Sequence, residues 1–221
     1  VLFNDDYYPT LGRANVRLVT DAVERIEPDA VRSKGGEPIA ADVIIYATGF
    51  HATDFLAPMS VTGAGGRDLK QEWQHGAHAY LGVTVSGFPN LFMLYGPNTN
   101  LGHNSIVFML ERQIGYVVRC VSDMAARGLR WRDVRPEAQA ASNARLVEEL
   151  SRTVWAGSCH NWYRNAAGRI TNNWSTYTWR YWARTRRPDP TEFEDGPRRD
   201  VRSSPAVAAP PDVDDRQPAG V

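Results

Sequence analysis

The chain has 221 residues, 43% of them hydrophobic and 23% charged, which is typical of a soluble globular protein with one sizeable domain or two small ones. Its 25 basic and 25 acidic side chains balance, so no net charge attracts nucleic acid or an anionic membrane surface. Two cysteines offer no disulfide framework or metal-site spacing, and no apolar run is long enough to span a membrane. We therefore expect a cytoplasmic protein.

The first fifty residues are predicted to form a small meander that leads into one buried strand. Short apolar patches alternate with turn residues, and we expect strands at residues 16–19, 25–26, 31–32 and 43–46. The last of these, Val-Ile-Ile-Tyr, is continuously apolar, which favours burial on both faces in a parallel sheet between helices. The predicted fold class is therefore α/β.

Small residues follow this last strand. Ala47, Thr48 and Gly49 precede the aromatic residue Phe50. Alanine and glycine at the end of a strand allow another chain segment or a cofactor to come close to the backbone. A core strand that ends in a tight turn is the alternative, and the stretch by itself does not decide between the two.

Two helices are expected further along the chain, after a stretch that is mostly loop. Residues 51–90 contain one short predicted helix at 69–73 and a predicted strand at about 80–85, and a second buried strand is expected at 91–95. A long helix at 105–127 should end at Gly128, and a helix at 136–154 should follow. Their predicted buried faces consist of Ile106, Met109, Leu110, Ile114, Val117, Val118 and Val121, and of Leu146, Val147, Leu150 and Val154.

The polar sequence GPNTNLGHNS, at residues 96–105, is the second candidate site. It lies between an apolar strand and the start of a long helix, where open α/β sheets bind ligands. The unpaired N–H groups and the dipole of a helix N-terminus favour a negative group there. Asn104 or Ser105 can cap the helix. A polar connecting loop with a good cap is the alternative.

Together these two stretches resemble a known family. DVIIYATGF, followed about forty residues later by GFPNLFMLYGPNTNLGHNS, is similar to the C-terminal half of the class B flavoprotein monooxygenases, which comprise the Baeyer–Villiger and flavin-containing monooxygenases. NDDYYP and RTVWAGSCHNWY also look like Baeyer–Villiger sequences, so the resemblance covers roughly residues 1–184.

The resemblance implies an FAD- and NADPH-dependent monooxygenase that inserts one oxygen atom from O2 into a ketone through a C4a-peroxyflavin. An enzyme that oxygenates nitrogen or sulfur atoms is the alternative within the family. A chain that acts only as a structural or interaction module is the alternative outside it. The implied partners are a small ketone or an N- or S-containing substrate and O2, with no nucleic acid and no prediction of the oligomeric state.

The resemblance also implies which residues contact FAD and NADP(H). The residues after the strand at 43–46 would lie where the NADP and FAD domains meet, and the loop at 98–105 would face the isoalloxazine ring. Trp162 would lie near the nicotinamide ribose, with interdomain packing as its alternative role. The expected cofactor-binding residues are Ala47, Thr48, Gly49, Phe50, Gly96, Pro97, Asn98, Thr99, Asn100, Leu101, His103, Asn104, Ser105 and Trp162.

The sequence departs from the family by lacking a GxGxxG motif. Residues 63–66 come nearest, but Asp68 stands where the third glycine should be, and a turn is predicted there. The family's two glycine motifs and its active-site arginine would lie upstream of Val1, so we expect a C-terminal fragment of a flavoprotein with two dinucleotide-binding domains, without a catalytic residue and inactive alone.

Four segments are expected on the family pattern. Residues 1–50 would end the NADP-binding domain, 51–128 would return into the FAD-binding domain, and 129–184 would form a helical, aromatic segment. Residues 185–221, which hold seven of the 14 prolines, are predicted to be a disordered tail.

Three further clusters are weaker candidates. His75 and His78 lack a third ligand at suitable spacing, so we predict no metal site. Cys159 beside His160 has no neighbour in the sequence that would orient a nucleophile. The aromatic, arginine-containing stretch at 174–187 is expected to pack within the protein rather than to stack on nucleic acid.

Overall fold

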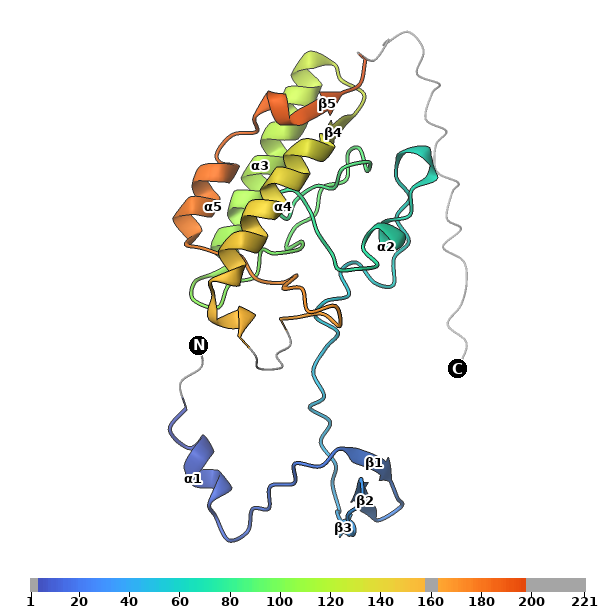
Figure 1. Cartoon of the computed structure of the whole chain (residues 1–221), viewed down its shortest axis with the longest axis vertical. Helices are drawn as coiled ribbons and strands as arrows, with labels where there is room; N and C mark the ends of the chain where they lie inside the picture. The colour runs from blue at the N-terminus through green and yellow to red at the C-terminus, as the bar shows by residue number, and fades with distance from the viewer. Residues whose placement is uncertain (1–3, 158–162, 198–221) are drawn as a thin grey trace, which may run out of the picture. The chain divides into compact units, whose positions relative to one another are not determined.

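The computed structural model describes residues 4–157 and 163–197, which fall into two compact units, Val1–His51 and Ala52–Val221 (Figure 1). Within these residues the paired strands of both sheets are antiparallel. None of the helices in the described part of the chain is long and apolar enough to cross a membrane.

The first unit contains one short helix and a three-stranded sheet. Its elements are α1 (Tyr7–Leu11), β1 (Val23–Ile26), β2 (Ala30–Ser33) and β3 (Pro38–Ala40), with the strands in the order β1-β2-β3. The strands predicted at 25–26 and 31–32 are confirmed as β1 and β2, and β3 was not predicted. Gly35 has a φ of 76°, the left-handed conformation that favours glycine in the turn between β2 and β3.

The strands predicted at residues 16–19 and 43–46 are not formed. Neither segment pairs with a described strand, and Val43 and Ile45 are 77% and 86% exposed. A strand forms only where neighbouring strands take its backbone hydrogen bonds. The apolar pattern shows a preference for burial, but it does not show whether a pairing partner lies beside the segment.

The second unit contains three longer helices and one two-stranded sheet. Its elements are η1 (Ala64–Gly66), α2 (Leu69–Glu72), α3 (Ile106–Arg127), β4 (Arg132–Val134), α4 (Pro136–Ser151), η2 (Val154–Ala156), α5 (Thr178–Thr185), η3 (Pro190–Glu192) and β5 (Phe193–Asp195). The predicted helices are confirmed as α2, α3 and α4, and the turn predicted at 63–66 is confirmed as η1. Gly128 ends α3 in the predicted left-handed conformation, with a φ of 64°.

The largest helical contact joins α3 and α5, and α4 completes the core around them (Figure 1). Met109 of α3, Leu150 of α4 and Tyr181 of α5 meet in one cluster of buried side chains, which also includes Leu101 and Trp174. Burying each large apolar side chain of this kind contributes about 2 kcal/mol to folding. The same cluster therefore holds the three helices together and the end of the 96–105 loop in place.

The buried face of α3 differs from the predicted one. Its buried residues are Met109, Gln113, Tyr116, Cys120 and Met124, whereas the predicted core residues Ile114, Val118 and Val121 are 47%, 56% and 51% exposed. Val147 and Val154 of the second predicted face are exposed as well. Met109, Leu146 and Leu150 are buried as predicted, but the buried face of α3 is shifted from the apolar stripe because the polar residue Gln113 lies at its centre. Buried Gln113 accepts the backbone N–H of Tyr95 at 2.8 Å and donates to the Tyr181 hydroxyl at 3.1 Å.

The strand predicted at 80–85 is a tight turn instead, and the one predicted at 91–95 is an irregular segment. Tyr80 donates its backbone N–H to Thr84 at 2.7 Å, and Leu81 and Gly82 between them have φ values of 52° and 69°. Met93 donates its N–H to Val83 at 2.7 Å, which packs the second segment against the first. Left-handed residues interrupt an extended strand, so apolar composition alone gave the wrong backbone conformation here.

The start of the predicted disordered tail is part of the fold. Residues 193–195 form β5, which pairs with β4, and the Phe193 side chain is 3% exposed. Proline-rich composition suggested disorder, but strand pairing, one buried aromatic side chain and the ion pair of Asp195 with Arg132 attach this segment. Residues from 198 onward lie outside the described part of the chain.

Arg132 of β4 is the centre of that ion pair. Its side chain is 2% exposed, and Nε donates to Asp195 Oδ1 at 2.7 Å while Nη2 donates to Asp195 Oδ2 at 2.9 Å. Nη2 also lies 2.7 Å from Asp123 Oδ2 of α3, and the guanidinium lies 5.2 Å from the centre of the Phe193 ring. One buried cation therefore joins β4, β5 and the end of α3.

Replacement of this cation tests the network. We expect Arg132→Ala to lower the free energy of unfolding by about 3 kcal/mol, because it removes the buried partner of Asp195 and leaves that carboxylate only the half-exposed Arg127, at 2.7 Å. The control is Arg152→Ala, which breaks the exposed pair of Arg152 with Glu148 and is expected to cost less than about 1 kcal/mol. Chemical denaturation followed by tryptophan fluorescence measures both, and equal losses would contradict the network.

The network also predicts how stability depends on pH. Hydrogen bonding to Arg132 holds the pKa of Asp195 below its usual value of 3.8. This stabilisation is complete above the unfolded-state pKa and is lost as the pH falls through the lower pKa of the folded state. We expect stability to fall less steeply below pH 3.8 in Asp195→Asn than in the wild type, with Glu194→Gln, at an exposed ion pair, as the control. The prediction would be contradicted if the free energy of unfolding depended on pH in the same way in the wild type and in Asp195→Asn.

Candidate functional site

The 96–105 loop is held against residues 170–174, far away in the sequence, by a short parallel pairing. The backbone N–H of Asn98 donates to Thr171 at 2.8 Å, that of Asn100 donates to Asn172 at 2.9 Å, and that of Trp174 donates back to Asn100 at 2.8 Å. This pairing satisfies the backbone groups of a largely buried loop, so the loop has a fixed conformation.

The side chains of Asn98 and Asn100 strengthen this pairing. Asn98 has a φ of 58° and donates Nδ2 to the carbonyls of Ile170 at 2.8 Å and Asn173 at 3.1 Å. Asn100 donates Nδ2 to Asn173 Oδ1 at 2.8 Å and accepts the Tyr95 hydroxyl at 2.9 Å. Each amide makes two hydrogen bonds to protein groups, so their observed role is to shape the loop.

The first part of the loop is buried for structural reasons. A Cβ at Gly96 would lie 2.3 Å from the Gly82 carbonyl oxygen, so glycine is needed here for contact with another chain segment. The Thr99 hydroxyl donates to the Gly96 carbonyl at 2.8 Å, and Thr99 itself is fully buried. Pro97 and Leu101 are buried too. These four residues therefore anchor the loop in the interior of the second unit.

The last part of the loop is exposed and leads into α3. Ser105 is the N-cap of α3 but makes no side-chain capping hydrogen bond, and the first turn of α3 contains no acidic residue. The Asn104 side chain instead accepts the backbone N–H of Ser105 at 2.7 Å and donates to Thr178 at 3.1 Å. The His103 ring contacts the edge of Tyr177. A 22-residue helix thus begins at the surface without a side-chain acceptor for its first N–H groups.

The other predicted cofactor residues are in a different part of the chain. Ala47, Thr48, Gly49 and Phe50 belong to the first unit, where all four are exposed and Phe50 is 97% exposed. The loop at 96–105 belongs to the second unit, so their joint role stays a prediction. The predicted Trp162, and Cys159 with His160, lie outside the described residues.

The segment at 170–174 was missed by sequence reasoning. Its sequence, Ile-Thr-Asn-Asn-Trp, resembles the Asn-Thr-Asn of the loop in its short polar residues, but pairing between distant loops leaves no periodic pattern. Asn173 is fully buried with its Nδ2 unpartnered, and the fully buried Gln113 was also missed. The run of short polar residues directly before Trp174 was the available sign for the segment at 170–174.

Two cavities border this part of the second unit. One, of about 250 Å³, is lined by Asn98, Ile170 and the α4 residues Leu146 and Leu150, among others. The other, of about 680 Å³, lies between residues 53–60, α2 and residues 165–167. His78 faces the smaller cavity and bonds the Gly76 carbonyl, at 3.2 Å; among the described residues no group of three or more side chains could hold a metal ion.

Comparison with solved structures defines the class of protein to which the fold belongs. No family model matches the chain. In the solved structures, a steroid monooxygenase bound to NADP superposes with a TM-score of 0.72 at 26% identity, covering 86% of this chain and 37% of that one. OTEMO in complex with FAD and NADP superposes with a TM-score of 0.75 at 27% identity over the same shares. The fold is thus that of part of a flavoprotein monooxygenase with two dinucleotide-binding domains.

Proteins related in sequence identify a family within this class of flavoproteins. A Baeyer–Villiger monooxygenase of Pseudomonas aeruginosa is 40% identical over 195 residues, which are 87% of this chain and 37% of the relative. Another, of Streptomyces coelicolor, is 37% identical over 88% of this chain and 38% of its own length. The chain is related to part of the Baeyer–Villiger monooxygenases, as its motifs predicted, and it spans a little over a third of the length of these relatives.

The left-handed conformation of Asn98 leads to a test of the loop. We expect Asn98→Gly to destabilise the protein by about 2 kcal/mol, because two side-chain hydrogen bonds are lost. Asn98→Ala loses the same bonds and should cost about 1 kcal/mol more than Asn98→Gly. Alanine, unlike glycine, has a Cβ that disfavours a φ of 58°, and unlike asparagine it has no polar side chain to stabilise that conformation locally. Denaturant unfolding of both variants measures the difference, and equal values would show that the backbone conformation carries no strain.

Proposed function

We propose that this chain forms the flavin-facing part of an FAD- and NADPH-dependent Baeyer–Villiger monooxygenase. The observation that carries the proposal is the exposed N-terminus of α3, held in place by the pairing of residues 96–105 with 170–174. The relation to Baeyer–Villiger monooxygenases supports it, as do the solved relatives bound to FAD and NADP. A small ketone and O2 are the proposed substrates, and the cytoplasm is the proposed compartment.

The loop and helix fit a reduced flavin. Its isoalloxazine ring is anionic at one edge, and a helix N-terminus carries about half a positive charge. The first N–H groups of α3 have no side-chain acceptor, and no carboxylate in the first turn competes for them. His103, Asn104 and Ser105 are exposed there and would contact the ring edge. When bound, FAD would supply the redox chemistry with O2, and NADPH would supply the hydride.

The residues of this chain would contribute binding and orientation. The buried part of the loop, from Gly96 to Leu101, would keep the start of α3 at a fixed position, so that the N–H groups need no reorganisation as negative charge develops. Ala47, Thr48, Gly49 and Phe50 would contact the cofactors where the NADP and FAD domains meet, and Trp162 would lie near the nicotinamide ribose.

Product analysis tests the proposed activity. The gene product that carries this chain is incubated with FAD, NADPH, labelled O2 and either a cyclic ketone or a thioether. We expect the ketone to give a lactone with one labelled oxygen atom. A sulfoxide from the thioether without lactone would replace the Baeyer–Villiger assignment by N- or S-oxygenation. NADPH consumption without an oxygenated product from either would overturn both.

A charge placed at the start of α3 tests the flavin-facing role. We expect His103→Glu to reduce kcat/KM for the ketone about fivefold more than the uncharged, size-matched His103→Gln, because a carboxylate offsets the positive helix terminus. The flavin reduction potential should also be lower in the Glu variant. Equal potentials in the two variants would show that the flavin does not sense this helix terminus.

A further inference from the structure

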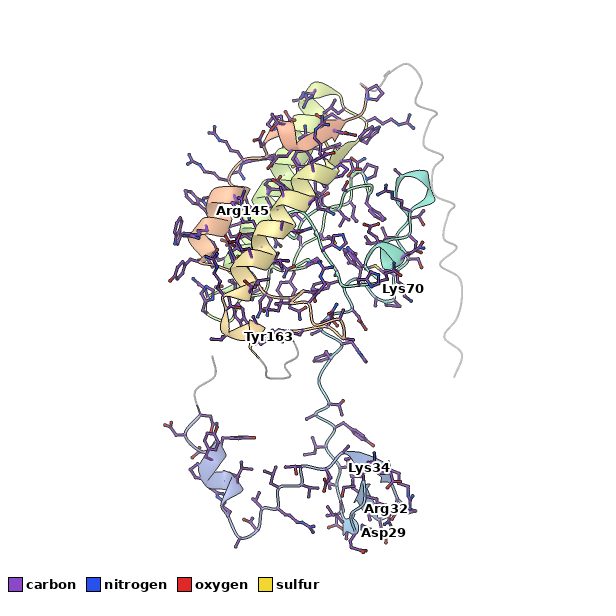
Figure 2. All side chains as sticks on the ribbon, in the orientation of Figure 1. Asp29, Arg32, Lys34, Lys70, Arg145 and Tyr163 are labelled. Carbon is purple, nitrogen blue, oxygen red and sulfur yellow. The ribbon has the colours of Figure 1, made fainter. Side chains whose placement is uncertain are left out.

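A cavity of about 400 Å³ opens where α4, the end of α5 and η3 meet. Three arginines line it: Arg145 of α4, which Figure 2 labels, Arg184 of α5, and Arg187 just beyond α5. None of the three has a carboxylate within ion-pair distance in the described part of the chain. We call these residues the arginine pocket.

Arg184 shows most clearly that the guanidinium groups of this pocket lack a direct ion pair. Its Nη2 donates to the Ser142 hydroxyl at 2.9 Å, and its guanidinium lies 5.8 Å from the centre of the Trp174 ring. These partners orient the group but carry no negative charge, and the carboxylates that act on it, Glu149 and Glu192, lie beyond ion-pair distance. Burial, and then the nearby Arg145, lower the pKa of Arg184. A half-buried cation next to a second cation is unfavourable unless an anion joins them.

Three acidic residues also line the pocket, and in the described part of the chain none lies within ion-pair distance of the three arginines: Glu137 of α4 is exposed, and the other two accept hydrogen bonds from neutral groups. Glu192 accepts the Tyr80 hydroxyl, and Asp189 accepts both the N–H of Thr191 at 2.9 Å and its hydroxyl at 2.7 Å. The fourth arginine of the rim, Arg135, is paired with Glu194 at 3.0 Å. The pocket therefore presents guanidinium groups with free donors to the solvent.

We propose that the arginine pocket binds an oxyanion, the phosphate or carboxylate group of a small molecule. Guanidinium groups are planar and offer paired donors that match the two oxygens of either anion. Arg184 is held in place by Ser142 and Trp174. Arg145 and Arg187 are exposed, so their side chains can move toward a bound ligand. This site does not depend on the proposed monooxygenase activity, because it uses none of the predicted cofactor residues.

Titration of the full chain with inorganic phosphate tests the proposal. The ionic strength is held constant with sodium chloride, and binding is followed by calorimetry and by the rise in Tm. We expect saturable 1:1 binding and a Kd about tenfold weaker in Arg145→Gln and in Arg187→Gln, each of which loses a charge-assisted hydrogen bond. Both replaced side chains are exposed, so circular dichroism should show an unchanged fold.

A second titration with succinate distinguishes the two sources of the anion. Saturation by phosphate alone, or by succinate alone, supports the site and identifies the ligand class. The control variant is Arg130→Gln, an exposed arginine outside the pocket that should bind like the wild type. The proposal is overturned if neither anion saturates, if chloride raises Tm equally, or if both pocket variants bind like the wild type.

Discussion

The hydrogen bonds between residues 98–100 and 171–174 are the constraint on which the second unit depends. They join two loops, neither of which has the regular structure to hold its own backbone groups. Trp174, at the end of one loop, packs on Tyr181 of α5 and shares the core with Met109 of α3. Because both helices start next to the paired segments, the position of the α3 N-terminus follows from the pairing.

Local features of this fold could be predicted from the sequence, whereas pairings between distant segments could not. The three predicted helices and the stop at Gly128 depend on spacing and on one glycine, which are properties of neighbouring residues. The start of α3 after the 96–105 loop was predicted, but the segment at 170–174 that pairs with this loop was missed, because parallel pairing of two loops produces no periodic sequence pattern. The apolar run at 43–46 was assigned a strand although no described strand pairs with it. Its role with the 96–105 loop stays a prediction.

Two arginines of the second unit show how environment decides the role of one residue type. Arg132 is almost fully buried, yet Asp195 and Asp123 neutralise its charge. Its guanidinium group therefore links β4 and β5 to α3. Arg184 is fixed by a hydroxyl and an indole ring and has no carboxylate within ion-pair distance in the described part of the chain. The first acid partner comes from the proline-rich segment that composition assigned to disorder. The ion pair with Arg132 therefore stabilises an ordered structure in a segment for which the composition predicted disorder.

The pairing of the two loops also limits how related proteins can diverge. Inserting or deleting one residue within 98–100 would shift its register against 171–174, and it would move Asn98 out of the conformation in which its amide reaches both carbonyls. Changes in length are tolerated only if they fall outside the paired residues, for example in the exposed turn around Gly168. Evolution of a new substrate range is therefore expected to proceed by substitution in the paired loops and by changes of length around them.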